Sequence, residues 1–125
     1  LAIEPDSATR WTNLGAARSA AGRYAEAAEA TREALRRAPG DRTARLNLAR
    51  YLLHLGDAAG ALAEVERLLA HTPDADALAL RGVLRGNAGD LAGARADFEA
   101  AVALEPNQPE ATMGLRRLQA MPGPR

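Results

Sequence analysis

Apolar and small residues recur at helical spacing along the chain, beginning with the stretch RWTNLGAARSAAGRYAEAAEA at residues 10–30. At 3.6 residues per turn, one face of a helix here carries Trp11, Leu14, Gly15 and Arg18. The pattern predicts a first helix from Ser7 to Ala21 and a second from about Tyr24 to Arg37. Few β-branched and many Ala and Leu residues favour helices throughout, so we predict an all-α fold.

Three landmarks repeat along the chain in one register. Prolines spaced by 34, 34 and 33 residues are Pro5, Pro39, Pro73 and Pro106. A glycine in each interval is Gly22, Gly56 or Gly89, and an alanine five residues later is Ala27, Ala61 or Ala94. A fixed period of this length is typical of a helical repeat array.

Each repeat is expected to hold two helices. The glycine of each interval stands where a helix would end in a left-handed turn, and the next helix stops before the following proline. The linkers APGD, TPDAD and EPNQ place Asp or Asn where it can cap the next helix. We therefore predict six paired helices of about 14 residues each and a seventh from about Asn107 to Ala120.

These residues resemble the tetratricopeptide repeat, a unit of 34 residues with two helices. The first repeat matches at Trp11, Leu14, Gly15, Gly22, Tyr24, Ala27, Ala34 and Pro39. The second matches at Leu48, Ala49, Gly56, Ala61, Leu68 and Pro73. The third matches at Gly82, Gly89, Asp90, Leu91, Ala94, Phe98, Ala101 and Pro106. The first repeat departs from the family pattern at Arg18 and Thr31, where Tyr and a large apolar residue are usual.

The resemblance implies a right-handed all-α solenoid in one domain. Its parts would be a remnant of a preceding repeat at 1–6, repeats at 8–41, 42–74 and 75–108, a capping helix at 109–120 and a disordered tail at 121–125. Small residues at Gly15, Ala49 and Gly82 would let the two helices of each pair cross closely. In the capping helix, Ala111, Leu115 and Leu118 would cover the third repeat, while Arg116, Arg117 and Gln119 would face water.

The charge and composition narrow the partner class. Sixteen basic residues balance sixteen acidic ones, which argues against nucleic acid or an anionic membrane as a partner. All the basic residues are Arg, which suggests a GC-rich, bacterial gene. Because no segment approaches about 20 apolar residues, direct membrane insertion is not expected. We expect a cytoplasmic protein, with the periplasm as the alternative if an upstream signal was removed.

Catalytic and metal-binding patterns are not found. The two histidines, His54 and His71, fall on different helices, and the chain has no cysteine. The carboxylates at Asp74 and Asp76 begin a helix, which indicates capping rather than a cation site. We therefore expect no enzyme activity, no metal and no cofactor.

The resemblance implies instead a concave groove lined by the first helix of each repeat. The residues expected on this face are Thr9, Thr12, Asn13, Thr43, Leu46, Asn47, Arg50, Leu53, His54, Leu80, Val83, Asn87 and Arg117. Asn13 and Asn47 occupy the same repeat position, so their amides could bind the backbone of an extended peptide. The alternative is that these amides bond to neighbouring helices. We expect Asn47, Arg50 and Leu80 to matter for binding and not for folding.

A family variant that clamps the C-terminal carboxylate of chaperones is not predicted. It needs basic residues and Asn at positions where this chain has Thr12, Ala16, Asp76 and Leu80, and only Asn47 fits. The expected function is a non-enzymatic protein-interaction module for an extended peptide or a partner helix, within a larger protein. The alternatives are a scaffold that associates with itself through the solenoid ends, or an adaptor region of a multidomain enzyme.

Overall fold

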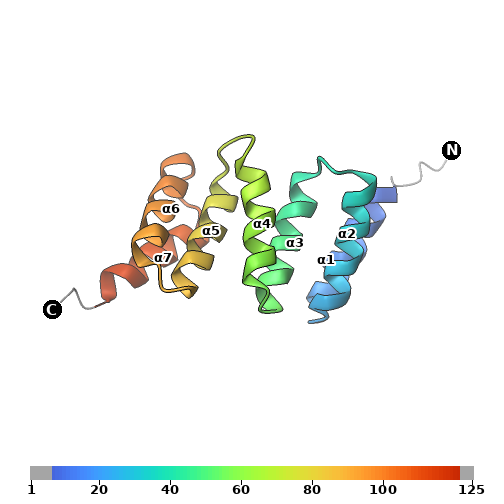
Figure 1. Ribbon diagram of the computed structural model, residues 1–125, viewed down its shortest axis with the longest axis horizontal. Coiled ribbons are helices and arrows are strands. Elements are labelled where there is room, and N and C mark those ends of the chain that lie inside the picture. The colour runs from blue at the N-terminus through green and yellow to red at the C-terminus, as the bar shows by residue number, and fades with distance from the viewer. Residues whose placement is uncertain (1–6, 122–125) are drawn as a thin grey trace. The chain divides into compact units, whose positions relative to one another are not determined.

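The computed structural model describes residues 7–121, and within them it contains seven α-helices and no strand (Figure 1). The helices are α1 (Ser7–Ala20), α2 (Tyr24–Arg37), α3 (Arg42–His54), α4 (Ala58–Leu69), α5 (Ala75–Asn87), α6 (Leu91–Leu104) and α7 (Pro109–Ala120). The predicted all-α fold is confirmed. No helix in the described part of the chain is both long and apolar enough to cross a membrane.

Glycine ends the first helix of every predicted repeat, as expected. Gly22, Gly56 and Gly89 have φ angles of +77°, +81° and +89°, in the left-handed region that other residues rarely adopt. After α1, the N–H of Arg23 donates to the Arg18 carbonyl at 2.8 Å, which satisfies one of the carbonyls left unpaired at the helix end. The glycine period in the sequence thus marks turns with one repeated geometry.

Acidic side chains cap four of the helices. The carboxylates of Asp41, Asp57, Asp74 and Asp90 each accept a hydrogen bond from the backbone N–H three residues later, at 3.2, 2.9, 2.7 and 2.9 Å. The linker EPNQ behaves differently from the expectation that its Asn caps α7. Gln108 is the cap, and its Oε1 accepts from the N–H of Ala111 at 2.7 Å. Pro109 fixes the first helical position, so the cap must be the residue directly before it.

Arg23 is the residue directly before α2, and its side chain makes no capping hydrogen bond. The backbone of Arg23 (φ −95°, ψ 69°) is close to that of the capping residue Asp90 (φ −84°, ψ 78°), so an aspartate could cap α2 in the same way. We expect Arg23→Asp to raise the free energy of unfolding by about 1 kcal/mol, less the small contribution of the Arg23–Glu26 contact. Urea unfolding compares it with Arg23→Ala, which removes the same contact without adding a cap. Equal stability of the two variants would contradict the prediction.

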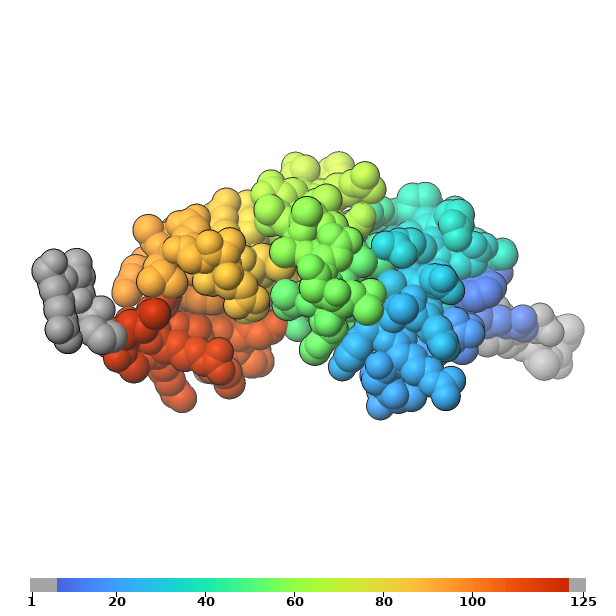
Figure 2. All heavy atoms as spheres, turned by 60° about the horizontal axis from the view of Figure 1, so that its bottom comes forward, coloured from blue at the N-terminus to red at the C-terminus, as the bar shows by residue number. Residues whose placement is uncertain are grey.

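The chain divides into two compact units, unit 1 at residues 1–64 and unit 2 at 65–125, with the division inside α4. The single domain expected from the repeats stays a prediction. In unit 1, α2 packs on both α1 and α3, and in unit 2, α7 packs on both α5 and α6. Figure 2 shows α7 in red beside the yellow and orange helices of unit 2. Because the helices of a repeat array pack mainly on their neighbours along the chain, compact groups of a few helices can form within it.

Small residues allow the paired helices to cross closely. A Cβ built on Gly15 would lie 2.6 Å from Oγ1 of Thr31 and 3.2 Å from the Ala27 carbonyl on α2. A Cβ on Gly82 would lie 2.5 Å from the ring of Phe98 on α6. The predicted role of these glycines is confirmed. The unusual Thr31 is accommodated because its hydroxyl donates to the Ala27 carbonyl at 2.8 Å.

Helix α7 packs on the core of unit 2 through the residues that the sequence predicts. Ala111 is fully buried, Leu115 and Leu118 are half-buried against the core around Phe98, and Arg116, Arg117 and Gln119 are exposed. The repeat boundaries remain predictions. The predicted remnant at 1–6 and residues 122–125 of the predicted tail lie outside the described residues.

Candidate functional site

The part of the predicted groove face in unit 1 lies on α1 and α3. Thr9, Asn13, Thr43 and His54 are exposed, whereas Thr12, Leu46, Asn47, Arg50 and Leu53 are half-buried. The Thr12 hydroxyl donates to the Ala8 carbonyl of its own helix at 3.1 Å. Among the described residues, the amides of Asn13 and Asn47 take part in no hydrogen bond, so the structure does not support the alternative that they bond to neighbouring helices. Both amides therefore keep their donors and acceptors for a ligand.

His54 packs as an aromatic residue at the end of α3. Its imidazole stacks on the ring of Tyr24, with centroids 4.2 Å apart and planes 4° from parallel. Tyr51 lies 6.4 Å from Tyr24, and burial raises the pKa of its phenol, although a hydrogen bond with Ser19 acts in the opposite direction. Within residues 7–121, no three His, Cys, Asp or Glu side chains gather where they could hold a metal ion. Packing thus accounts for the His54 ring in this structure.

The part of the face in unit 2 forms a hollow of about 350 Å³. Three of the predicted residues line it together, namely Val83 and Asn87 from α5 and Arg117 from α7. The other lining residues are Gly82 and Gly86 from α5, Leu91, Ala94 and Phe98 from α6, Glu110, Met113, Gly114 and Leu118 from α7, and Met121. Leu91, Met113 and Met121 are exposed, so the hollow offers apolar surface to a ligand.

Leu80 does not lie on an exposed face, and that expectation was wrong. Its side chain is 1% exposed and is among the largest fully buried ones. A side chain without exposed surface contributes to folding rather than to ligand contact. Its sequence position, equivalent to Asn13 and Asn47, identified a helix face but could not show how deeply that face is covered here.

Glycine gives the hollow its depth. The ring of Phe98 fills the space that a Cβ would need at both Gly82 and Gly114, so these two glycines let α5 and α7 approach the ring. Gly86, one turn after Gly82, has only the Ala94 Cβ nearby, at 3.6 Å from a Cβ built on it. The space over Gly86 is therefore open, and the hollow extends between α5 and α7 down to α6.

The two charged residues that line the hollow, Glu110 and Arg117, differ in whether they already have a polar partner. The Glu110 carboxylate accepts a hydrogen bond from Nε2 of Gln108 at 2.9 Å, and the same nitrogen donates to Asp76 at 3.1 Å. Arg117 is exposed and has no ion-pair partner among the described residues. The hollow thus combines an apolar wall with one uncompensated cation, an arrangement suited to an apolar group beside an anion.

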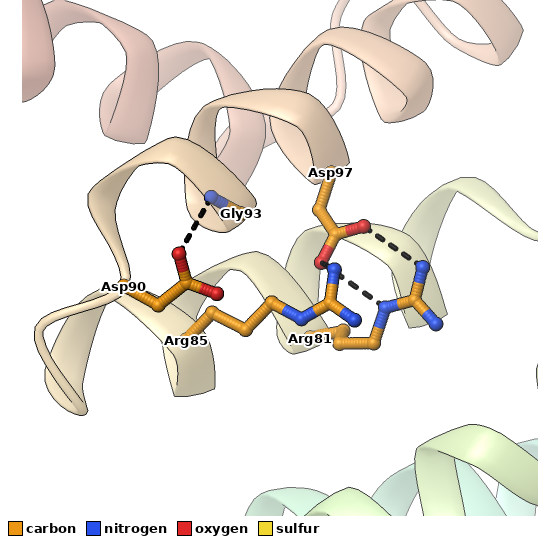
Figure 3. A network of polar contacts seen from close by, with 5 residues as sticks. All are labelled: Arg81, Arg85, Asp90, Gly93 and Asp97. Carbon is orange, nitrogen blue, oxygen red and sulfur yellow. Dashed lines mark hydrogen bonds and ion pairs between the residues drawn. The ribbon is translucent and has the colours of Figure 1, made fainter.

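A buried ion-pair network lies elsewhere in unit 2, between α5 and α6 (Figure 3). Asp97, whose side chain is 4% exposed, accepts hydrogen bonds from Arg81 at 2.9 and 3.1 Å and from Arg85 at 3.0 Å. The hydrogen bonding to Asp97 raises the pKa of Arg81, although burial acts against it. Unit 1 contains a related pair, in which Arg45 donates to Glu64 at 2.8 Å.

Sequence reasoning missed this network and part of the hollow. The signal for the network was the presence of Arg81 and Arg85 at the repeat positions of the buried Leu48 and Leu52. The signal for the α7 wall was the helical spacing of Glu110, Met113, Arg117 and Met121 along one face. The contribution of α6 to the hollow, through Leu91 and Phe98, has no such signal because it depends on the glycines opposite.

A second hollow, of about 480 Å³, lies on α1 and α2 of unit 1. It is lined by Trp11, Arg18, Glu29, Arg32, Glu33 and Arg36. Glu33 already pairs with Arg36 at 2.9 Å and with Arg37 at 3.1 Å, three and four residues further along the same helix. The Glu33 carboxylate in this hollow is therefore already compensated by arginines of its own helix.

Comparison with protein families gives two matches, both described as the tetratricopeptide repeat. One covers residues 19–84 and the other residues 79–115. No curated protein sequence matches the chain.

Among solved structures, several tetratricopeptide domains share the fold. The first TPR domain of Spaghetti (RPAP3), bound to the HSP90 peptide SRMEEVD, is 25% identical with a TM-score of 0.83, and the match covers 94% of each chain. The first TPR domain of human RPAP3 is 26% identical with a TM-score of 0.84, over 93% of this chain and 92% of that one. The Arabidopsis OM64 TPR domain is 23% identical with a TM-score of 0.85, over 91% and 95%.

Proposed function

Because the chain belongs to the tetratricopeptide repeat family, we propose that it is a non-enzymatic protein-interaction module that binds an extended peptide or a partner helix. The binding surface would be the groove face defined above without Leu80. The observation that carries this proposal is that the Asn13 and Asn47 amides make no hydrogen bond with the described residues. A peptide backbone offers one donor and one acceptor per residue, and an amide side chain can bind both.

The hollow in unit 2 supports the same proposal. The sequence and its family resemblance predict Val83, Asn87 and Arg117 on the groove face, and all three line one largely apolar hollow. The TPR domain of Spaghetti, similar over 94% of this chain, is bound to a peptide of seven residues. We propose that this chain also binds a peptide, but not through a clamp on the peptide's C-terminal carboxylate. Such a clamp needs basic residues and Asn at positions where this chain has Thr12, Ala16 and Asp76.

Peptide selection tests the proposed function. A displayed library of random dodecapeptides is selected on the wild-type chain, and an enriched peptide is then synthesised and its affinity measured. Asn47→Ala should weaken binding roughly tenfold to a hundredfold, since losing one hydrogen bond in a desolvated groove costs about 1–3 kcal/mol. Arg50→Glu should weaken an acidic peptide and strengthen a basic one, so its sign reports the ligand's charge.

The control is Asn107→Ala, which removes an exposed amide in the linker before α7, outside the groove face. Melting temperatures of all variants are measured in parallel. If Asn47→Ala and Arg50→Glu both fold and keep the wild-type affinity, the groove face is not the binding site.

A further inference from the structure

The hollow in unit 2 is large enough to select one part of a ligand. An apolar protein cavity of about 150 Å³ can hold a benzene molecule. The hollow has about 350 Å³ and opens to the surface, so a Phe, Trp or Leu side chain fits with room for the adjoining backbone. The wall formed by Val83, Leu91, Met113 and Leu118 carries no hydrogen-bonding side-chain group, so a polar side chain packed against this wall would lose its water without compensation.

The charge at the hollow limits the ligand further. Arg117 lines the hollow, is exposed, and has no ion-pair partner among the described residues. The one acidic lining residue is Glu110, whose carboxylate accepts a hydrogen bond from Gln108. Glu110 precedes Arg117 by seven residues on the same face of α7, which is about 10 Å along the helix axis at 1.5 Å per residue. An anionic ligand group is therefore favoured at the Arg117 end of the hollow.

We propose that this hollow anchors one large apolar side chain of a bound peptide, with an acidic group of the same peptide paired to Arg117. The inference rests on the proposed function and adds the chemistry of the partner. The anchor lies over Gly86, where α5 has no side chain, and against the ring of Phe98. The acidic group follows or precedes the anchor within a few residues, because Arg117 borders the same hollow.

Filling the hollow provides the decisive variant. Gly86→Leu places a side chain in the space over Gly86, where a Cβ meets only Ala94 at an ordinary contact distance. Because leucine favours a helix more than glycine does, the variant should fold at least as stably as the wild type. Ala100→Leu adds the same side chain to an exposed position of α6 that does not line the hollow, and serves as the control.

The probe is the dodecapeptide enriched on the wild-type chain in the selection described above. We expect enriched sequences to contain Phe, Trp or Leu within three positions of Asp, Glu or the C-terminus. Gly86→Leu should weaken binding of that peptide at least tenfold, and Ala100→Leu should not. Arg117→Glu should also weaken it at least tenfold, whereas Arg116→Glu, an exposed neighbour that does not line the hollow, should change it less than threefold.

The outcomes separate this inference from the proposed function. If Asn47→Ala weakens binding while Gly86→Leu leaves it unchanged, the peptide binds the groove face elsewhere and the anchor site is wrong. Enriched peptides without a large apolar residue would overturn it as well. If no peptide is enriched over an unrelated protein, both the inference and the proposed function fail.

Discussion

Replacing Asp97 with alanine is expected to lower the free energy of unfolding of unit 2 by about 3 kcal/mol. The substitution removes the carboxylate that Arg81 and Arg85 share and leaves two guanidinium groups together between α5 and α6. Removing one partner of a buried ion pair typically costs about 3–5 kcal/mol. The lower end applies here because the Arg85 side chain is 34% exposed and can regain water.

The sole tryptophan makes the location of this effect measurable. Trp11 lies in unit 1, so its fluorescence reports that unit, while far-UV circular dichroism reports the helices of both units. In Asp97→Ala, the dichroism transition in urea should move to lower concentration more than the fluorescence transition. Equal movement of both would show that the two units unfold together.

A triple variant separates charge from packing. Changing Arg81 and Arg85 to leucine together with Asp97→Ala gives unit 2 the leucines that the preceding repeat has at Leu48 and Leu52. Replacing a whole buried ion network by apolar residues is often neutral or stabilising, so most of the lost stability should return. If the triple variant is no more stable than Asp97→Ala, the unpaired charges of Arg81 and Arg85 are not the cause of the stability lost in Asp97→Ala.

Leu80→Ala is expected to lower the free energy of unfolding by about 2–5 kcal/mol, the range for removing a fully buried leucine. The Leu80 side chain is 1% exposed, so its removal leaves a cavity that the surrounding helices can fill only in part. Leu104→Ala is the matched control, because that leucine, on α6, is 53% exposed. Its replacement should change stability by less than about 1 kcal/mol.

Chemical unfolding followed by circular dichroism measures both leucine variants. A Leu80→Ala protein as stable as Leu104→Ala would contradict the burial of Leu80. An accessible Leu80 would be able to contact a ligand. Loss of peptide affinity in a Leu80→Ala protein that remains folded would point the same way.

Local features of the fold could be predicted because they depend on a few neighbouring residues. Gly22, Gly56 and Gly89 end helices because only glycine adopts the left-handed turn cheaply, and Asp41 and Asp74 cap helices through atoms three residues away. The exception at α7 has a local cause as well. Pro109 fixes where the helix starts, and this shifts the cap from Asn107 to Gln108.

The candidate site was less predictable than the helices. The burial of a side chain and the choice of an ion-pair partner depend on residues distant in the sequence. The family resemblance and the helical period together place Val83, Asn87 and Arg117 on the predicted groove face, and these three residues line one hollow. The burial of Leu80 and the wall formed by Phe98 depend on how closely helices approach. The pairing of Asp97 with Arg81 joins residues 16 apart on different helices, which helical periodicity does not reveal.

The network around Asp97 also restricts which substitutions the sequence can accept. Arg81 uses two different nitrogens, Nε and Nη2, to reach the two oxygens of one carboxylate. Lysine carries a single charged nitrogen and cannot reproduce this fork, although it keeps the charge. All sixteen basic residues are Arg, and exchange for Lys at exposed positions such as Arg116 would be nearly neutral. At Arg81 the same change would break a contact, so a mutation conservative in charge would be selected against there.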